Sequence, residues 1–157
     1  ICLFGAELTY AGQNLRNFSF DKDTQNISRR YRDFISILIM SLIAKRFERN
    51  EPPYTAEEIS EEHQIPIRLT NQTLYQLQEI NLIHEVVTDQ KSEEIAYQPS
   101  MDLNQLNVAV VLDRLDTYGS ENFKIDKEVE FSDEWRILVE SREEYYKKAS
   151  KVLLKEL

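Results

Sequence analysis

The side chains that could carry catalysis or hold a metal are few in this sequence. The only histidines are His63 and His84, and the only cysteine is Cys2. Neither histidine has a Ser, Cys or Asp partner at a recognisable motif spacing, so general-base or nucleophilic catalysis is not indicated. No Cys/His cluster has zinc-site spacing, and one cysteine cannot form an internal disulfide. We therefore expect no catalytic residues, no metal and no cofactor, in a reducing compartment.

The densest group of carboxylates is a set of four glutamates between Thr55 and His63. They are Glu57, Glu58, Glu61 and Glu62. Helical spacing places the first beside the third and the second beside the fourth. A calcium ion needs six or more oxygen ligands, and nothing nearby supplies the others. The pattern therefore favours a solvated acidic helix face over a cation site.

Residues 55–98 have the order of a winged helix-turn-helix, which is helix, turn, helix and strand pair. Thr55 can cap the first helix, with Glu58 three residues later. Pro66 disfavours helical geometry at Ile65 and so makes the turn. The second helix is expected to open at Leu69 or Thr70. Two β-favouring runs, 85–87 and 94–99, lie around a polar loop and predict a two-stranded wing.

The exposed side of the second helix is the candidate interaction surface. Its residues are Arg68, Thr70, Asn71, Gln72, Tyr75, Gln76 and Glu79. Asn and Gln can pair with adenine in a DNA groove. However, residues 55–100 carry nine acidic and two basic side chains, a net charge of −7, and Lys and Arg supply most non-specific DNA affinity. We expect this surface to bind a basic protein surface, with DNA as the less favoured alternative.

The composition fits one mostly helical unit around a single core. The chain has 157 residues, 41% of them hydrophobic, with three Gly and four Pro, which leaves little room for long flexible linkers. Its net charge of −9 argues against general affinity for nucleic acids or anionic membranes. Residues 1–50 differ, because eight basic and five acidic groups give them a net charge of +3.

Apolar periodicity predicts helices on both sides of the helix-turn-helix. Residues 27–47 have apolar side chains at three- and four-residue spacing and form the first core helix. A further helix spans 103–118 and stops at Gly119. A last helix, capped by Ser132, runs to about Leu157. The predicted fold class is therefore mainly α, a winged helix-turn-helix with a small two-stranded wing and extra N- and C-terminal helices.

The last helix carries an apolar stripe that is the candidate dimer helix. It includes Trp135, Leu138, Tyr145, Tyr146 and Val152. Such a stripe could pack on the domain itself or form a homodimer seam with a second copy. Both interpretations fit the sequence.

The opening residues carry a family resemblance. Phe4-Gly5-Ala6-Glu7-Leu8-Thr9-Tyr10 resembles the end of the last transmembrane helix in the YihY/BrkB family of membrane proteins, long labelled ribonuclease BN-like. The middle of the chain, with Ala56, Ile59-Ser60 and Ile65-Pro66, resembles winged-helix repressors. Residues 1–11 are too short to cross a bilayer. They could be the last turns of a membrane helix or an amphipathic helix on a soluble core.

A basic stretch follows these opening residues. It is the candidate membrane-proximal patch, made of Arg16, Lys22, Arg29, Arg30 and Arg32. Positive charge at this distance marks the cytoplasmic side of a membrane helix. The three arginines near residue 30 could bind anionic lipid headgroups or RNA, or they could form a solvated helix start.

The resemblance implies a bacterial inner- or plasma-membrane protein with this domain in the cytoplasm. Residues 1–20 would be the end of a transmembrane helix and a juxtamembrane segment, 21–120 the winged-helix domain, and 121–157 a linker and an amphipathic helix. The domain would act in regulation or protein interaction, binding a partner or the cytoplasmic loops of its own membrane core. A membrane-tethered DNA-binding regulator is the alternative. The label also implies a tRNA-processing ribonuclease, but the chain has no His-x-His-x-Asp-His string.

Overall fold

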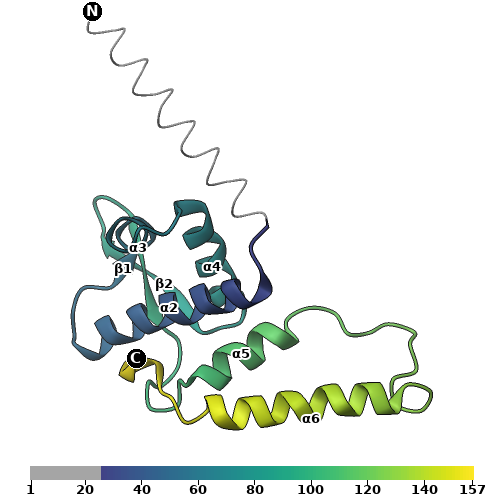
Figure 1. Cartoon of the computed structure of the whole chain (residues 1–157). Coiled ribbons are helices and arrows are strands. Elements are labelled where there is room, and N and C mark those ends of the chain that lie inside the picture. The colour runs from purple at the N-terminus through teal and green to yellow at the C-terminus, as the bar shows by residue number, and fades with distance from the viewer. Residues whose placement is uncertain (1–25) are drawn as a thin grey trace, which may run out of the picture.

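The computed structural model describes residues 26–157. Its elements are α2 (Arg29–Glu48), β1 (Tyr54–Thr55), α3 (Ala56–His63), α4 (Ile67–Glu79), β2 (Ile83–Asp89), β3 (Glu94–Pro99), α5 (Val108–Thr117), α6 (Ser132–Ala149) and the short 3-10 helix η1 (Leu154–Glu156). Helix α2 crosses the middle of the molecule, with α3, α4 and the sheet on one side and α5 and α6 on the other (Figure 1). The mainly helical fold class predicted from the sequence is confirmed.

The core forms where α2 meets the helix-turn-helix. Ile39, Met40 and Ile43 of α2 are fully buried, together with Ile59 of α3 and Leu77 of α4. Burying an aliphatic side chain of this size contributes about 1.5–3 kcal/mol. The predicted helix over 27–47 is therefore confirmed, and its apolar face holds the helix-turn-helix in place.

The helix-turn-helix forms through local capping. Thr55 Oγ1 accepts a hydrogen bond from the Glu58 N–H at 3.2 Å, as the capping pattern predicts. Helix α3 ends at Gln64, whose φ of 53° is left-handed. Helix α4 begins at Ile67, earlier than predicted, because a proline restricts the residue before it and not the one after it. The Pro66 carbonyl accepts from the Thr70 N–H at 2.9 Å.

The predicted two-stranded wing is present as β2 and β3, and a third strand, β1, which was not predicted, joins it. Strands β2 and β3 pair antiparallel, and β1 joins the other side of β3, giving the order β1-β3-β2. Tyr54 pairs with Tyr97 and Thr55 with Ala96. A strand of two residues has no periodicity, so sequence reasoning missed it. β1 ties the start of α3 to the base of the wing.

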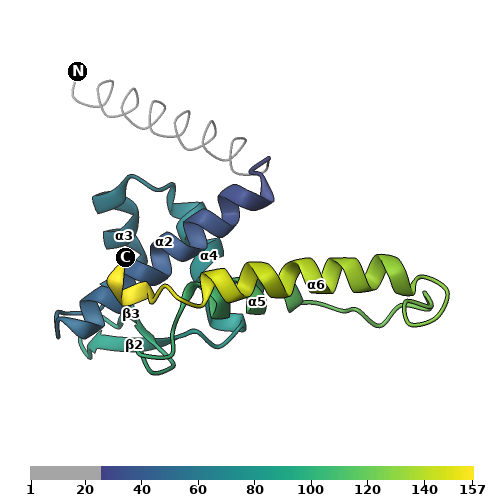
Figure 2. The same cartoon turned by 60° about the horizontal axis from the view of Figure 1, so that its bottom comes forward.

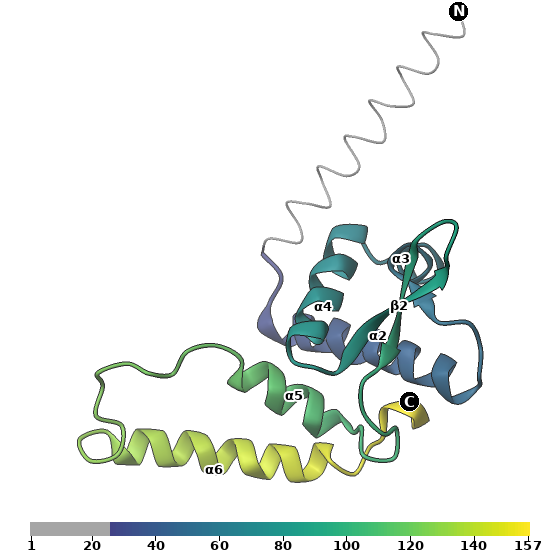
Figure 3. The same ribbon diagram turned by 180° about the vertical axis from the view of Figure 1, so that it is seen from behind.

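Helices α5 and α6 form an arm that extends from the body (Figures 2 and 3). Helix α5 begins at Val108, five residues later than predicted, because the Asn107 side chain caps it by accepting from the Val110 N–H at 3.0 Å. Helix α6 ends at Ala149, well before the predicted end near Leu157. Its N-cap is Phe131, so Ser132 does not cap it.

The residues after α6 return to the body and enter the core. The Leu154 N–H donates to the Leu106 carbonyl at 3.1 Å. The Leu154 side chain is fully buried, and η1 packs against α2. The tail therefore fastens one end of α6 to the domain.

Among residues 26–157, no helix has the length and apolar character needed to span a membrane. The predicted membrane-helix end and juxtamembrane segment, residues 1–20, lie outside the described residues.

Candidate interaction surface

Most side chains of the candidate surface on the second helix are exposed. Arg68, Asn71, Gln72, Tyr75 and Glu79 are exposed on α4, and Gln76 is half-buried. Thr70 is the exception. It is fully buried, and its hydroxyl donates to the Pro66 carbonyl at 3.2 Å. Thr70 lies next to the buried Leu69, on the side of α4 that faces the core. It is therefore not part of the exposed candidate surface.

Apolar side chains that sequence reasoning did not select also lie on α4 and the wing. Tyr75 is 65% exposed and Ile67 is 41% exposed on α4. Val87 and Ile95 are opposite each other across the wing, 62% and 44% exposed. The β-favouring runs gave the signal for these two residues, but only the sheet register shows that they form an exposed pair.

The charge on α4 and the wing is negative. Between Ile67 and Pro99, five acidic and two basic side chains are exposed, a net charge of −3. This charge contributes to a raised pKa at two tyrosines. Burial, then Glu85 and Glu57, raise the pKa of Tyr97. At the other end of α4, the charge of Glu79 raises the pKa of Tyr118, whose hydroxyl donates to that carboxylate at 3.3 Å.

The four glutamates of α3 are not one solvated face, as the sequence suggested. Glu58 and Glu62 form ion pairs with Arg46 of α2, at 2.9 and 3.5 Å. Glu57 is exposed beside the base of the wing, and Glu61 is exposed one turn later. Half of the group thus anchors α3 to α2, and half contributes negative charge to the surface.

The predicted basic patch is divided by the structure. Arg29, Arg30 and Arg32 are exposed at the start of α2, whereas Arg16 and Lys22 lie outside the described residues. Arg29 and Arg32 line a cavity of about 400 Å³ together with Gln76 of α4. The start of α2 is therefore next to the second half of the helix-turn-helix, a proximity that the sequence separation concealed.

The two histidines occupy separate places. His63 Nε2 is 3.9 Å from Glu62, and its ring lies edge-on to Tyr54. His84 Nδ1 is 3.0 Å from the Ser100 hydroxyl. Within the described part of the chain, no three His, Cys, Asp or Glu side chains gather so that they could hold a metal ion.

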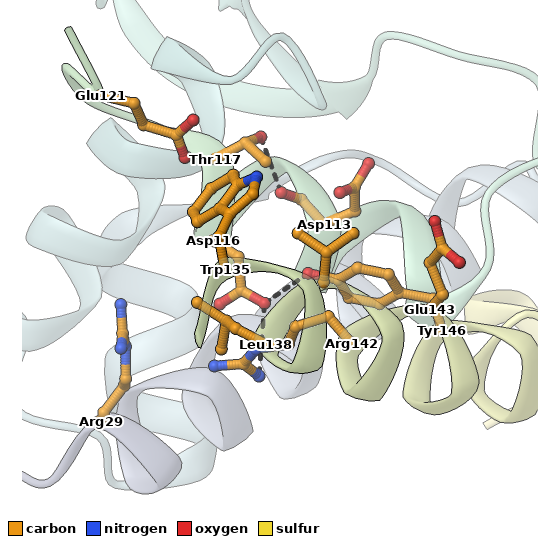
Figure 4. A pocket seen from close by; sticks show the side chains of 11 residues that line it. Arg29, Asp113, Asp116, Thr117, Glu121, Trp135, Leu138, Arg142, Glu143 and Tyr146 are labelled. Atoms are coloured by element: carbon orange, nitrogen blue, oxygen red, sulfur yellow. Dashed lines mark hydrogen bonds and ion pairs between the residues drawn. The ribbon is translucent and has the colours of Figure 1, made fainter. Parts of the chain in front are cut away.

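The stripe on α6 is divided between two directions. Trp135 and Tyr146 are half-buried and line, with residues of α5, a cavity of about 430 Å³ (Figure 4). The Tyr146 hydroxyl donates to Asp116 at 2.5 Å, and burial followed by this bond raises the pKa of Tyr146. Leu138 and Tyr145 are 50% and 46% exposed.

Val152 does not belong to the candidate dimer helix. It follows the end of α6, and its carbonyl accepts from the Val108 N–H at 3.0 Å.

Solved structures of regulators resemble this chain. IscR of T. potens matches with a TM-score of 0.56 and 15% identity, over 83% of this chain and 85% of that one. The chain has the winged-helix fold of these regulators. CymR of Staphylococcus aureus matches with a TM-score of 0.54 and 16% identity, over 80% of this chain and 93% of the other. CymR (YrzC) of B. subtilis, the global cysteine regulator, matches with a TM-score of 0.53 and 13% identity, over 83% and 93%.

No family model and no curated protein matches the sequence. The likeness to the solved structures therefore establishes the fold. The function has to be argued from the surface itself.

Proposed function

We propose that this chain is a non-catalytic winged-helix regulatory domain whose α4 and wing bind a protein. The proposal extends to its setting, the cytoplasmic face of a YihY/BrkB-like integral membrane protein in the inner or plasma membrane of a bacterium. Its partner would be a basic protein surface or a cytoplasmic loop of the same protein's membrane core.

The observation that carries the proposal is the chemistry of the α4–wing surface. Its exposed charge is −3, and four apolar side chains stand out from it: Ile67, Tyr75, Val87 and Ile95. A duplex needs Lys and Arg to replace its counterions. A protein interface instead has aromatic and apolar anchors within a polar rim. This surface has the second composition.

The membrane setting is supported by the residues at the start of the chain. The Phe4–Tyr10 string resembles the end of a transmembrane helix, and the basic residues that follow have the sign expected on the cytoplasmic side. Arg29, Arg30 and Arg32 are exposed at the start of α2, where lipid headgroups could reach them.

Site-specific photo-crosslinking in the complete membrane protein tests the partner. A photoreactive residue in place of Tyr75 should give an adduct with one protein, and Tyr75 is suited to this because it is 65% exposed. Arg49, exposed at the far end of α2, is the matched control position. Peptide mass spectrometry separates a loop of the same protein from a second protein. Equal adducts at both positions, or none at position 75, would contradict the proposal.

DNA binding is the second candidate, and one observation favours it. Arg29 and Arg32 lie next to Gln76, so positive charge is present beside the second helix of the helix-turn-helix. Fluorescence anisotropy with mixed-sequence DNA at low salt tests this candidate directly. We expect no micromolar binding. Micromolar binding that weakens steeply with salt and is lost in the Arg29→Glu, Arg32→Glu double variant would replace the protein-binding function by DNA binding.

A further inference from the structure

We propose that the start of α2 docks on an anionic bilayer. The docking surface consists of the first two turns of α2 and the apolar depression beside them. It rests on the membrane setting of the proposed function, but it is separate from the α4–wing surface. The start of α2 lies on the opposite side of the body from the tip of the wing (Figures 1 and 3).

Two aromatic side chains stand out from the docking surface. Tyr31 is 52% exposed and Phe34 is 51% exposed, although both belong to the apolar periodicity that predicts this helix. Their ring centres are 5.6 Å apart, so the two rings form one patch. A helix that packs only on its own domain turns such side chains toward the core. The core therefore does not explain the position of these two rings.

The apolar area continues from the two rings to the turn between α3 and α4. A cavity of about 360 Å³ opens there, lined by the rings, by Leu38 of α2 and by Ile65 of the turn. None of the described residues that line it is acidic. The carboxylate of Asp33, next to Phe34 in sequence, lines a different cavity with Asp116 of α5. The docking surface is thus apolar without a nearby negative charge on its own side of α2.

Three arginines lie at the same end of the helix. Arg29, Arg30 and Arg32 are exposed, and residues 29–32 cover about one full turn, so positive charge lies on several sides of the helix start. The first turn of α2 has no acidic residue. Basic side chains at this end of a helix oppose the helix dipole, so these arginines do not stabilise α2. A negatively charged partner explains their place.

The charge of the rest of the domain sets its orientation toward such a partner. Residues 39–157 carry fourteen basic and twenty-four acidic side chains, a net charge of −10. An anionic surface repels this part and attracts the arginines, so the domain meets it with the start of α2 first. Arginines beside exposed aromatic rings are typical of protein surfaces at the headgroup level of a bilayer. A nucleic acid duplex would pair with the arginines but would leave the two rings without a hydrocarbon partner.

Vesicle partition of the 157-residue chain is the first test. The wild type should bind vesicles of phosphatidylcholine with about one-third phosphatidylglycerol roughly tenfold or more tightly than phosphatidylcholine alone, because each arginine near an anionic surface contributes about fivefold. Substituting Arg29, Arg30 and Arg32 together by Gln should remove this preference. Tyr31→Ser with Phe34→Ser should weaken binding roughly ten- to thirtyfold, because both rings lose their contact with hydrocarbon.

The far end of α2 supplies the matched control. Phe47 is 49% exposed and Arg49 is exposed, roughly 25 Å along the helix from the first turn. Phe47→Ser with Arg49→Gln removes the same kinds of side chain and should change binding by less than about twofold, because both lie outside the docking surface. A cooperative urea transition verifies that each variant is folded. A wild type without preference for the anionic vesicles, or variants that all bind alike, would overturn the proposal.

Tryptophan quenching identifies the residues that enter the bilayer. Trp135 is the only tryptophan of the chain, so a Trp135→Phe background allows one tryptophan to be placed at will. Brominated lipid in anionic vesicles should quench the fluorescence of Phe34→Trp and leave that of Phe47→Trp unchanged. Equal quenching at the two positions, or none at position 34, would refute the docking surface.

The outcomes separate this surface from the α4–wing function and from nucleic-acid binding. A photo-adduct at Tyr75 without vesicle binding would support the α4–wing function and refute the docking surface. Vesicle binding without the adduct would do the reverse. If the triple arginine variant loses binding to RNA while its vesicle binding is unchanged, the basic turn is a nucleic-acid surface and the proposal is wrong.

Discussion

Arg46 offers the sharpest test of how the helix-turn-helix is held on α2. Its guanidinium lies 3.4 Å above the centre of the Tyr54 ring. It also donates to Glu58 at 2.9 Å, to Glu62 at 3.5 Å and to the Pro52 carbonyl at 3.1 Å. The Arg46 side chain is 20% exposed, so one residue joins α2 to the loop, to β1 and to α3.

The magnitude follows from these contacts. A partly buried cation on an aromatic ring contributes about 0.5–2 kcal/mol. The two glutamates are 42% and 47% exposed, so water screens each ion pair to about 0.2–1 kcal/mol. Arg46→Met keeps the aliphatic stem and removes all of these contacts. We expect the free energy of unfolding to fall by about 2–3 kcal/mol, and the melting temperature to fall by roughly 5–10 °C.

Urea unfolding followed by circular dichroism measures the loss. Arg49→Met, three residues later and exposed, is the matched control and should change stability by less than about 0.5 kcal/mol. Arg46→Lys should lose about half as much as Arg46→Met, because lysine keeps the charge but not the planar group that stacks on the ring. If Arg46→Met is no more destabilising than Arg49→Met, the ring and carboxylate contacts do not hold α3 in place.

Three more substitutions probe the arm and the core. Leu154→Ala should cost about 2–4 kcal/mol, because it leaves a cavity beside α2, and faster amide exchange over 150–157 would report the released tail. Tyr146→Phe removes the hydrogen bond to Asp116 and should cost about 1 kcal/mol in urea unfolding; an unchanged midpoint would mean that this bond does not fasten α6. Burial, and then the Asp116 charge, raise the pKa of Asp33, so ionised Asp33 destabilises the folded chain. Asp33→Asn should therefore be more stable than wild type at pH 7, and the difference should shrink as the pH falls toward 4; a pH-independent difference would refute this explanation.

The amino-acid sequence by itself determined the elements whose signals are local. The Thr55 and Glu58 capping pattern, the turn at Pro66 and the stop at Gly119 depend on backbone chemistry within a few residues, and the structure has all three. The apolar spacing of α2 and α4 was enough to locate both helices, but three residues of the predicted apolar face of α2, Tyr31, Phe34 and Phe47, are about half exposed. The charge of the helix-turn-helix region was also a property of the sequence alone.

Tertiary structure decided which of these residues meet. β1 forms because Tyr54 and Thr55 pair with β3, about forty residues later. Helix α6 ends at Ala149, and the chain beyond it returns to the body, where Leu154 is buried in the core. Thr70 has the polarity of a surface residue, yet its hydroxyl is satisfied by the Pro66 carbonyl and so can be buried. Helix α6 has apolar residues on more than one side, and only its contact with α5 shows which of them are half-buried and which are exposed to solvent. Periodicity specifies the faces of a helix, whereas the partner of each face depends on contacts between residues far apart in the chain.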